Sequence, residues 1–144
     1  MEFEEALHKA GSFIKEAKAK GYFLCSVFSS STTSVFDEWI LHFAGKDSAL
    51  DCYIRGDAIH VDETRSIGEP VELNLTKVKV SISEALDSVG KPKSAVSTLV
   101  SLHRSPPVWT INFIKADMTV TTFDVNAETG KITREETASI LKRD

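Results

Sequence analysis

The chain has 144 residues, of which 42% are hydrophobic and 26% charged, and its formal net charge is −4 at pH 7. This length is enough to bury a core and predicts one compact domain. The lysines and arginines form no cluster, so the composition argues against a nucleic-acid partner. No apolar run approaches the length of a membrane span, and no export signal is visible, so we expect a cytoplasmic protein without a membrane partner.

The first half predicts a helix followed by strands. Residues 2–20 have apolar positions at the three-four spacing of one helix face. Residues 22–28 (YFLCSVF) suit a strand, whereas residues 29–34 (SSSTTS) predict a polar loop. Residues 38–64 then predict an antiparallel meander of three strands.

The middle of the chain predicts a joint and a short helix. Residues 62–70 are polar and separate the two halves, and the alternation of residues 71–75 predicts a strand. Ser81 and Glu84 have the spacing of a capping box. They predict a short helix that ends before Gly90.

The second half predicts another set of strands. Residues 95–103 (AVSTLVSLH) favour a strand, and a helix over residues 94–102 is the alternative left open. Residues 108–137 predict a second three-stranded meander. Its last turn requires a positive φ at Gly130.

The two meanders resemble each other. Trp39 and Phe43 in the first have counterparts in Trp109 and Phe113 of the second, at the same spacing. This pattern predicts an α+β fold of two tandem helix-plus-antiparallel-meander units, packed as one compact domain. The predicted repeats are residues 1–66, the more divergent one, and residues 71–144.

Three stretches of the second half carry a family resemblance: residues 83–86 (SEAL), 108–113 (VWTINF) and 123–132 (FDVNAETGKI). Together they resemble the PepSY domain, a family named after the propeptides of secreted peptidases. The match spans about residues 80–136. The resemblance implies a PepSY-like repeat in each half and a small, non-catalytic module that binds or restrains peptidases.

Residues capable of catalysis or metal binding are scattered. His42 and His60 could meet Cys52 across neighbouring strands, but no two histidines have the close spacing of metal ligands. Cys25 with His103 is the candidate nucleophile pair, yet a thiol inside an apolar strand is not typical of a catalytic cysteine. We therefore expect no catalytic residue, no metal and no cofactor.

Two carboxylate pairs also lack a catalytic interpretation. Asp51 with Asp57, and Asp124 with Glu128, fall where strand ends and turns are predicted. Solvated turn residues account for them without general-acid chemistry.

The sequence thus favours a non-catalytic protein- or peptide-binding module, peptidase-regulatory if the PepSY resemblance holds. A partner, or a second copy in a homodimer, would add to a sheet edge, either the strand of residues 71–75 or the one near Ile132. The candidate binding residues are Trp39, Trp109, His42 and Asn112, although paired tryptophans in a repeat are more often core.

The alternative is a small-molecule-binding protein or a small enzyme with a pocket between helices and sheet. A deep cavity lined by His42, Cys52 or Asn112 would favour this second interpretation.

Overall fold

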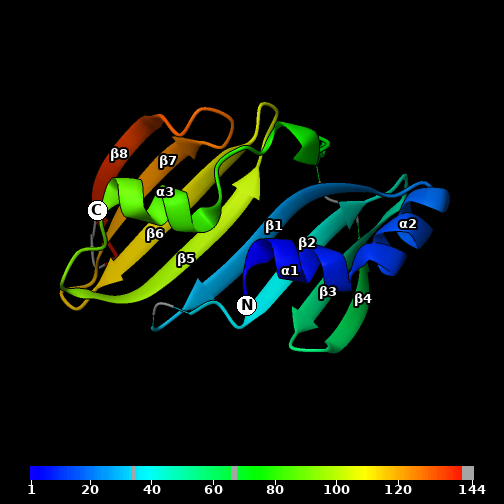
Figure 1. The fold of residues 1–144 in the computed structure, drawn as a ribbon, viewed down its shortest axis with the longest axis horizontal. Helices are drawn as coiled ribbons and strands as arrows, with labels where there is room; N and C mark the ends of the chain where they lie inside the picture. The colour runs from blue at the N-terminus through cyan, green and yellow to red at the C-terminus, as the bar shows by residue number, and fades with distance from the viewer. Residues whose placement is uncertain (34, 66–67, 141–144) are drawn as a thin grey trace.

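The computed structural model describes residues 1–33, 35–65 and 68–140. One antiparallel sheet of eight strands dominates it, in the order β4-β3-β2-β1-β5-β6-β7-β8 (Figure 1). The strands are β1 (Phe23–Ser31), β2 (Glu38–Ala44), β3 (Ser48–Arg55), β4 (Ala58–Arg65), β5 (Ala95–His103), β6 (Val108–Lys115), β7 (Thr119–Asn126) and β8 (Ile132–Ser139).

Three short helices lie on one face of this sheet: α1 (Phe3–Lys9), α2 (Gly11–Ala19) and α3 (Ile82–Val89) (Figure 1). The single helix predicted over residues 2–20 is in fact two. Ala10, between them, ends α1 with φ −87° and ψ 3°, and glycine lowers helix propensity where α2 begins.

The capping box of α3 is confirmed. The Ser81 hydroxyl accepts a hydrogen bond from the Glu84 backbone N–H at 3.1 Å, and the Glu84 carboxylate accepts one from the Ser81 N–H at 3.1 Å. The helix ends before Gly90, as the sequence predicts.

The predicted fold class is wrong. Residues 26–31 of β1 pair with residues 98–103 of β5, which joins all the strands into one continuous sheet. The molecule is therefore mostly an eight-stranded antiparallel sheet with three short helices, and not two tandem helix-plus-meander units. Because β1 and β5 are far apart in sequence, no local pattern indicates that they pair.

The polar stretch at residues 29–34 is also not simply a loop, because β1 continues through Ser31. Ser29 and Ser31 are buried, and each hydroxyl donates to a backbone carbonyl: Ser29 Oγ to Glu38 O at 2.5 Å and Ser31 Oγ to Val35 O at 2.6 Å. Because those bonds satisfy the hydroxyls, the strand can continue with serine on its inner face. The last residue of the predicted loop lies outside the described residues.

The strand predicted at residues 71–75 is wrong too. Leu73 is buried and its N–H donates to Leu24 O at 2.8 Å, but the segment has no strand geometry and leads into a 3-10 turn.

The outer strands are β4 and β8, so the other predicted edge, near Ile132, is confirmed. At residues 95–103 the strand is confirmed and the alternative helix is wrong. The positive φ at Gly130, 82°, is confirmed as well.

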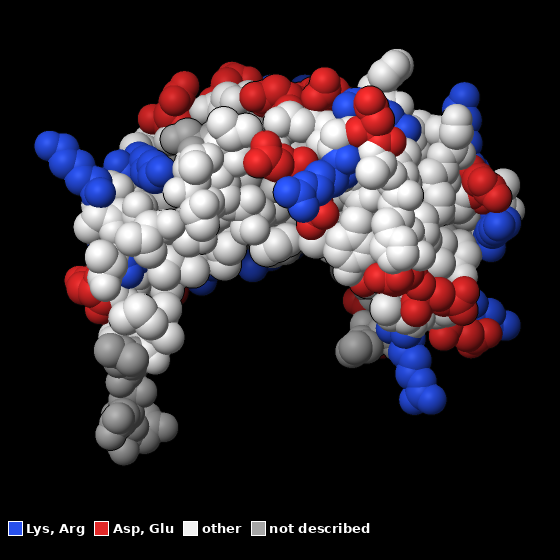
Figure 2. Space-filling model, turned by 90° about the horizontal axis from the view of Figure 1, so that it is seen from below, with Lys and Arg blue, Asp and Glu red and all other residues white. Residues whose placement is uncertain are grey.

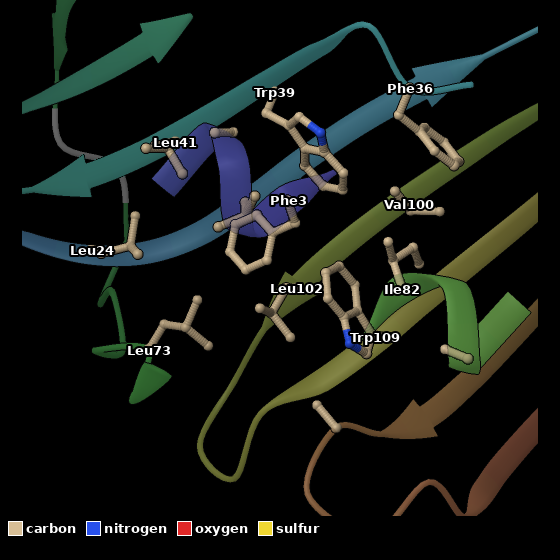
Figure 3. Packing of buried hydrophobic residues seen from close by; sticks show 14 of the residues in the cluster. Phe3, Leu24, Phe36, Trp39, Leu41, Leu73, Ile82, Val100, Leu102 and Trp109 are labelled. Atoms are coloured by element: carbon tan, nitrogen blue, oxygen red, sulfur yellow. The ribbon is translucent and has the colours of Figure 1, made fainter. Parts of the chain in front are cut away.

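The core lies between the helices and the sheet, and two tryptophans occupy its centre (Figure 3). The ring of Phe3 lies 5.2 Å from that of Trp39 and 5.7 Å from that of Trp109, between ring centroids. The Trp39 indole donates to Met1 O at 2.9 Å, and the Trp109 indole to Val80 O at 2.8 Å. Met1 and Val80 lie just before α1 and α3, so each tryptophan connects the start of one helix to the sheet by a hydrogen bond. The internal duplication and the domain bounds stay predictions.

Candidate functional site

The sheet face that carries no helix is hollowed like the underside of an arch (Figure 2). Side chains point alternately to the two faces of a strand. Leu41 of β2 is buried on the helix side, so its neighbours Ile40 and His42 point to the hollow. We call this surface the concave face. Its members, from the strand registers, include Ser26, Phe28, Ile40, His42, Asp51, Tyr53, His60, Leu99, Ser101, His103, Thr110, Asn112, Asp124 and Arg134.

Apolar side chains form a row on one half of the concave face. Phe28 pairs with Ile40, which pairs with Tyr53, and Tyr53 pairs with His60 on β4. Phe28 is 38% exposed, and Ile40 and Tyr53 are half-buried. The Tyr53 and His60 rings lie 6.0 Å apart. Phe28, Ile40 and Tyr53 thus form an apolar patch with two aromatic rings that is only partly exposed to water.

A histidine–carboxylate pair lies beside that row. His42 Nδ1 is 2.5 Å from Asp51 Oδ1. Because a carboxylate only accepts hydrogen bonds, Nδ1 carries the proton in this pair. Ser26 on β1 pairs with His42 on one side and with His103 on the other. Two histidines therefore flank one serine at the centre of the sheet.

His103 begins a chain of hydrogen bonds on the other half. The Thr110 hydroxyl donates to Asp124 Oδ1 at 2.7 Å, so it accepts from His103 Nε2–H at 2.8 Å. Burial, and after it the charge of Arg104, lowers the pKa of His103 below its usual 6.5. His103 is therefore neutral at pH 7, with its proton on Nε2.

Asp124 anchors that chain as a buried anion, its side chain only 5% exposed. Arg134 Nε donates to its Oδ2 at 2.9 Å. Burial alone would raise the pKa of Asp124, but the Thr110 hydrogen bond and the Arg134 charge outweigh burial and lower it. The carboxylate thus stays ionised through pairing.

An open hollow of about 320 Å³ lies at the end of the concave face where β5 ends and the β5–β6 turn begins. Arg104, in the β5–β6 turn, has a left-handed backbone with φ 75° and a side chain 56% exposed. Its Nη1 is 3.8 Å from Asp124 Oδ2, too far for a hydrogen bond. The hollow is lined by Cys25, His42, Pro70, Val71, His103 and Arg104.

The cysteines do not have the properties of nucleophiles. Cys25 Sγ donates to His42 O at 3.4 Å. Burial, followed by the negative charge of Asp51, raises the pKa of Cys25, and burial raises the pKa of Cys52 from 9.0 to about 11. Both thiols therefore hold their protons at neutral pH, which argues against a cysteine-dependent reaction.

We expect both cysteines to react slowly with Ellman's reagent in the folded protein. A pKa of about 11 in place of 9.0 lowers the thiolate fraction of Cys52 by about 100-fold at pH 8. Reaction rates in buffer and in denaturant measure the effect. A thiol that reacts equally fast in both would contradict these pKa shifts.

The structure separates most of the predicted site residues. Trp39 and Trp109 are fully buried, so neither offers a binding surface, whereas His42 and Asn112 lie on the concave face. Cys52 lies in the core and so does not meet His42. Within the described ranges 1–33, 35–65 and 68–140, no group of three or more histidine, cysteine or acidic side chains could hold a metal ion.

The structure corrects the interpretation of one member of each carboxylate pair, Asp51 and Asp124, whereas Asp57 and Glu128 are exposed turn residues, as predicted. Asp51 pairs with His42, while Asp57 forms an ion pair with Lys9 at 3.1 Å. Asp124 is a buried strand residue and not a solvated turn residue. No sequence signal indicated this burial, because the alternation of β7 places Asp124 on the face opposite to Phe123 and Val125.

A further cavity of about 290 Å³ lies between α2, β1, β2 and residues 72–76. Its lining includes none of His42, Cys52 and Asn112, the residues that would have favoured a small-molecule site. Of those residues, only His42 lines the open hollow on the other face of the sheet.

Comparisons with known proteins give the fold and little more. No family model matches the chain, and no curated protein matches it. A solved structure of a candidate lipoprotein from Clostridium difficile 630 is similar, with a TM-score of 0.67 and 12% sequence identity. The likeness covers 91% of this chain and 92% of that one. At this identity it shows a shared fold alone.

None of the helices in the described part of the chain is both long and apolar enough to cross a membrane.

Proposed function

We propose that the protein is a non-catalytic binding module whose concave face receives another protein or a peptide. The observation that carries this proposal is the arched, helix-free sheet face with its row of Phe28, Ile40 and Tyr53. A curved sheet can surround a convex surface or a loop of a partner, which a flat sheet cannot do. The partner would shield from water the apolar row that the chain itself leaves uncovered.

The composition of the concave face supports the proposal. Binding energy in protein interfaces concentrates on aromatic and arginine side chains surrounded by polar groups. Phe28 and Tyr53 supply the aromatic surface, and Arg104 and Arg134 lie across the sheet from them. Well-ordered polar pairs such as His42 with Asp51 would fix the orientation of a partner.

The face is a better docking surface than the sheet edges. All eight residues of β4 and of β8 are exposed, but charged side chains interrupt both strands. Charges on an edge strand discourage the addition of another strand. A homodimer through a sheet edge therefore stays a second outcome for the experiment below.

The resemblance to PepSY domains makes a peptidase the first class of partner to test. We also propose that the protein acts in the cytoplasm, which the two free cysteines support, since exported proteins usually oxidise their thiols. The structurally similar protein is described as a lipoprotein, so a surface-attached location is the competing expectation. Fractionation of cells that make the protein distinguishes the two.

A pair of matched variants tests the proposal. Phe28→Asp places a charge on the concave face, and Ile59→Asp places one at a side chain of similar exposure, 42% against 38%. Ile59 pairs with the buried Ile54 and so points to the opposite side of the sheet. Proteins captured from native cells by the wild type should also bind Ile59→Asp and should be lost with Phe28→Asp.

Circular dichroism and thermal melts first establish that both variants are folded. Equal capture by the two variants would contradict binding at the concave face. Concentration-dependent self-association that is unaffected by Phe28→Asp would instead favour an edge homodimer.

A further inference from the structure

We infer that the hollow at Arg104 binds a carboxylate side chain, Asp or Glu, presented by the partner. This inference rests on the proposed function, because it names the group that the partner would insert into this hollow of the concave face. The hydrogen-bonding capacity of the Arg104 guanidinium is largely unused.

Arg104 carries five N–H donors, yet it makes no hydrogen bond within the part of the chain that the structure describes. Its ion-pair partner Asp124 is 3.8 Å away from Nη1. That carboxylate already accepts hydrogen bonds from Thr110 Oγ1 at 2.7 Å and Arg134 Nε at 2.9 Å. Arg134 is thus the structural partner of Asp124, and the Arg104 guanidinium is left available.

The surroundings of Arg104 favour an anion there. Pro70 and Val71 form an apolar wall of the hollow, and the Arg104 side chain is 56% exposed, so a ligand can reach it while water is partly displaced. Attraction between opposite charges strengthens as water is excluded. The left-handed backbone at φ 75° also fixes the direction in which Arg104 leaves the turn, and such conformations are frequent where a ligand binds.

The neighbouring charges select the kind of anion. One guanidinium matches one carboxylate in the two-pronged geometry that arginine prefers. Asp51 and Asp124 lie close to the hollow, and a phosphate dianion would meet their repulsion with only one free cation to oppose it. A singly charged carboxylate is therefore the better fit. His42 also lines the hollow, and its Nε2 makes no hydrogen bond within residues 1–33, 35–65 and 68–140.

Nuclear magnetic resonance of the full chain tests this site without a known partner. Sodium acetate serves as the carboxylate probe, with sodium phosphate and sodium chloride at matched ionic strength. Acetate should shift the Arg104 side-chain signal and the backbone amides of residues 103 and 104 saturably, with a dissociation constant on the order of millimolar for so small a ligand. Chloride should not produce these shifts.

Arg104→Gln should weaken acetate binding at least about tenfold, because it removes the charge and the paired donors. Arg55→Gln, which removes another exposed arginine from β3, is the matched control and should bind acetate like the wild type. No saturable shift, an unchanged shift in Arg104→Gln, or tighter binding of phosphate than of acetate would overturn the inference.

The two proposals fail in different ways. Acetate binding at Arg104 together with capture that does not depend on Phe28 would leave the carboxylate site standing and reject the proposed function. Capture that depends on Phe28 but not on Arg104, without acetate binding, would reject the carboxylate site alone.

Discussion

Replacing Trp109 with alanine should lower the free energy of unfolding by about 3–5 kcal/mol, the usual effect of removing a large aromatic side chain from a core. Trp109 is fully buried and lies 6.4 Å from Trp39, edge to face, between ring centroids. The variant also leaves Val80 O without its 2.8 Å hydrogen bond from the indole. Urea denaturation monitored by circular dichroism measures the loss.

Trp109→Phe is the informative control, because it keeps the ring packing against Phe3 and loses the indole hydrogen bond. It should destabilise the protein less than Trp109→Ala, and the difference separates packing from hydrogen bonding. If Trp109→Ala cost less than about 1 kcal/mol, the region around Phe3 would not be the close-packed centre of the fold.

Replacing Asp124 with alanine should lower the free energy of unfolding by about 2 kcal/mol near neutral pH, the scale of hydrogen bonds to a charged group. The carboxylate is 5% exposed and accepts from Thr110 and Arg134. Its loss leaves the Thr110 hydroxyl without an acceptor and Arg134 without its closest anion. Urea denaturation measures this cost as well.

The pH dependence distinguishes the charge of Asp124 from its shape. The folded state lowers the pKa of Asp124 from 3.8, so its stabilising contribution is complete above the unfolded pKa and is lost as pH falls through the lowered value. Wild-type stability should therefore fall below about pH 4 by more than that of Asp124→Asn, which cannot titrate. If the stability of the wild type and of Asp124→Asn changed in parallel with pH, the Asp124 partners would not be lowering its pKa.

Local features of the fold could be predicted from the sequence because their causes are local. The Ser81–Glu84 capping box and the positive φ of Gly130 each depend on a few adjacent residues. The hydrophobic alternation around Trp39 and Trp109 likewise indicated strands with their large side chains on one face.

Features that depend on distant pairing could not be predicted. The β1–β5 pairing that makes one sheet joins residues 26–31 to residues 98–103, and buried serines in β1 hide its alternation. Residues 71–75 alternate like a strand, but the segment has no strand partner and packs against the core through Leu73 and the partly buried Leu75.

The candidate site was harder still to anticipate. His42 could be named from the sequence, but its link to Asp51 required the β2–β3 register. The chain from His103 to Arg134 passes through four consecutive strands, and its contacts depend on the exact register of all three hairpins, in which a slip of one residue would move every side chain to the other face. In the sequence Arg104 looks like an ordinary turn residue. Only the structure shows that Asp124 pairs closely with Arg134 and lies farther from Arg104.

The most direct measurement of the central claim, binding at the concave face, is photo-crosslinking from inside that face. A benzoylphenylalanine introduced at position 28 replaces an aromatic side chain that is 38% exposed, and the same group at position 59 reports on the opposite side of the sheet. We expect a specific crosslinked partner protein from position 28 and none from position 59 in cells that make the protein. Crosslinks from position 59 alone, or equally from both positions, would contradict it.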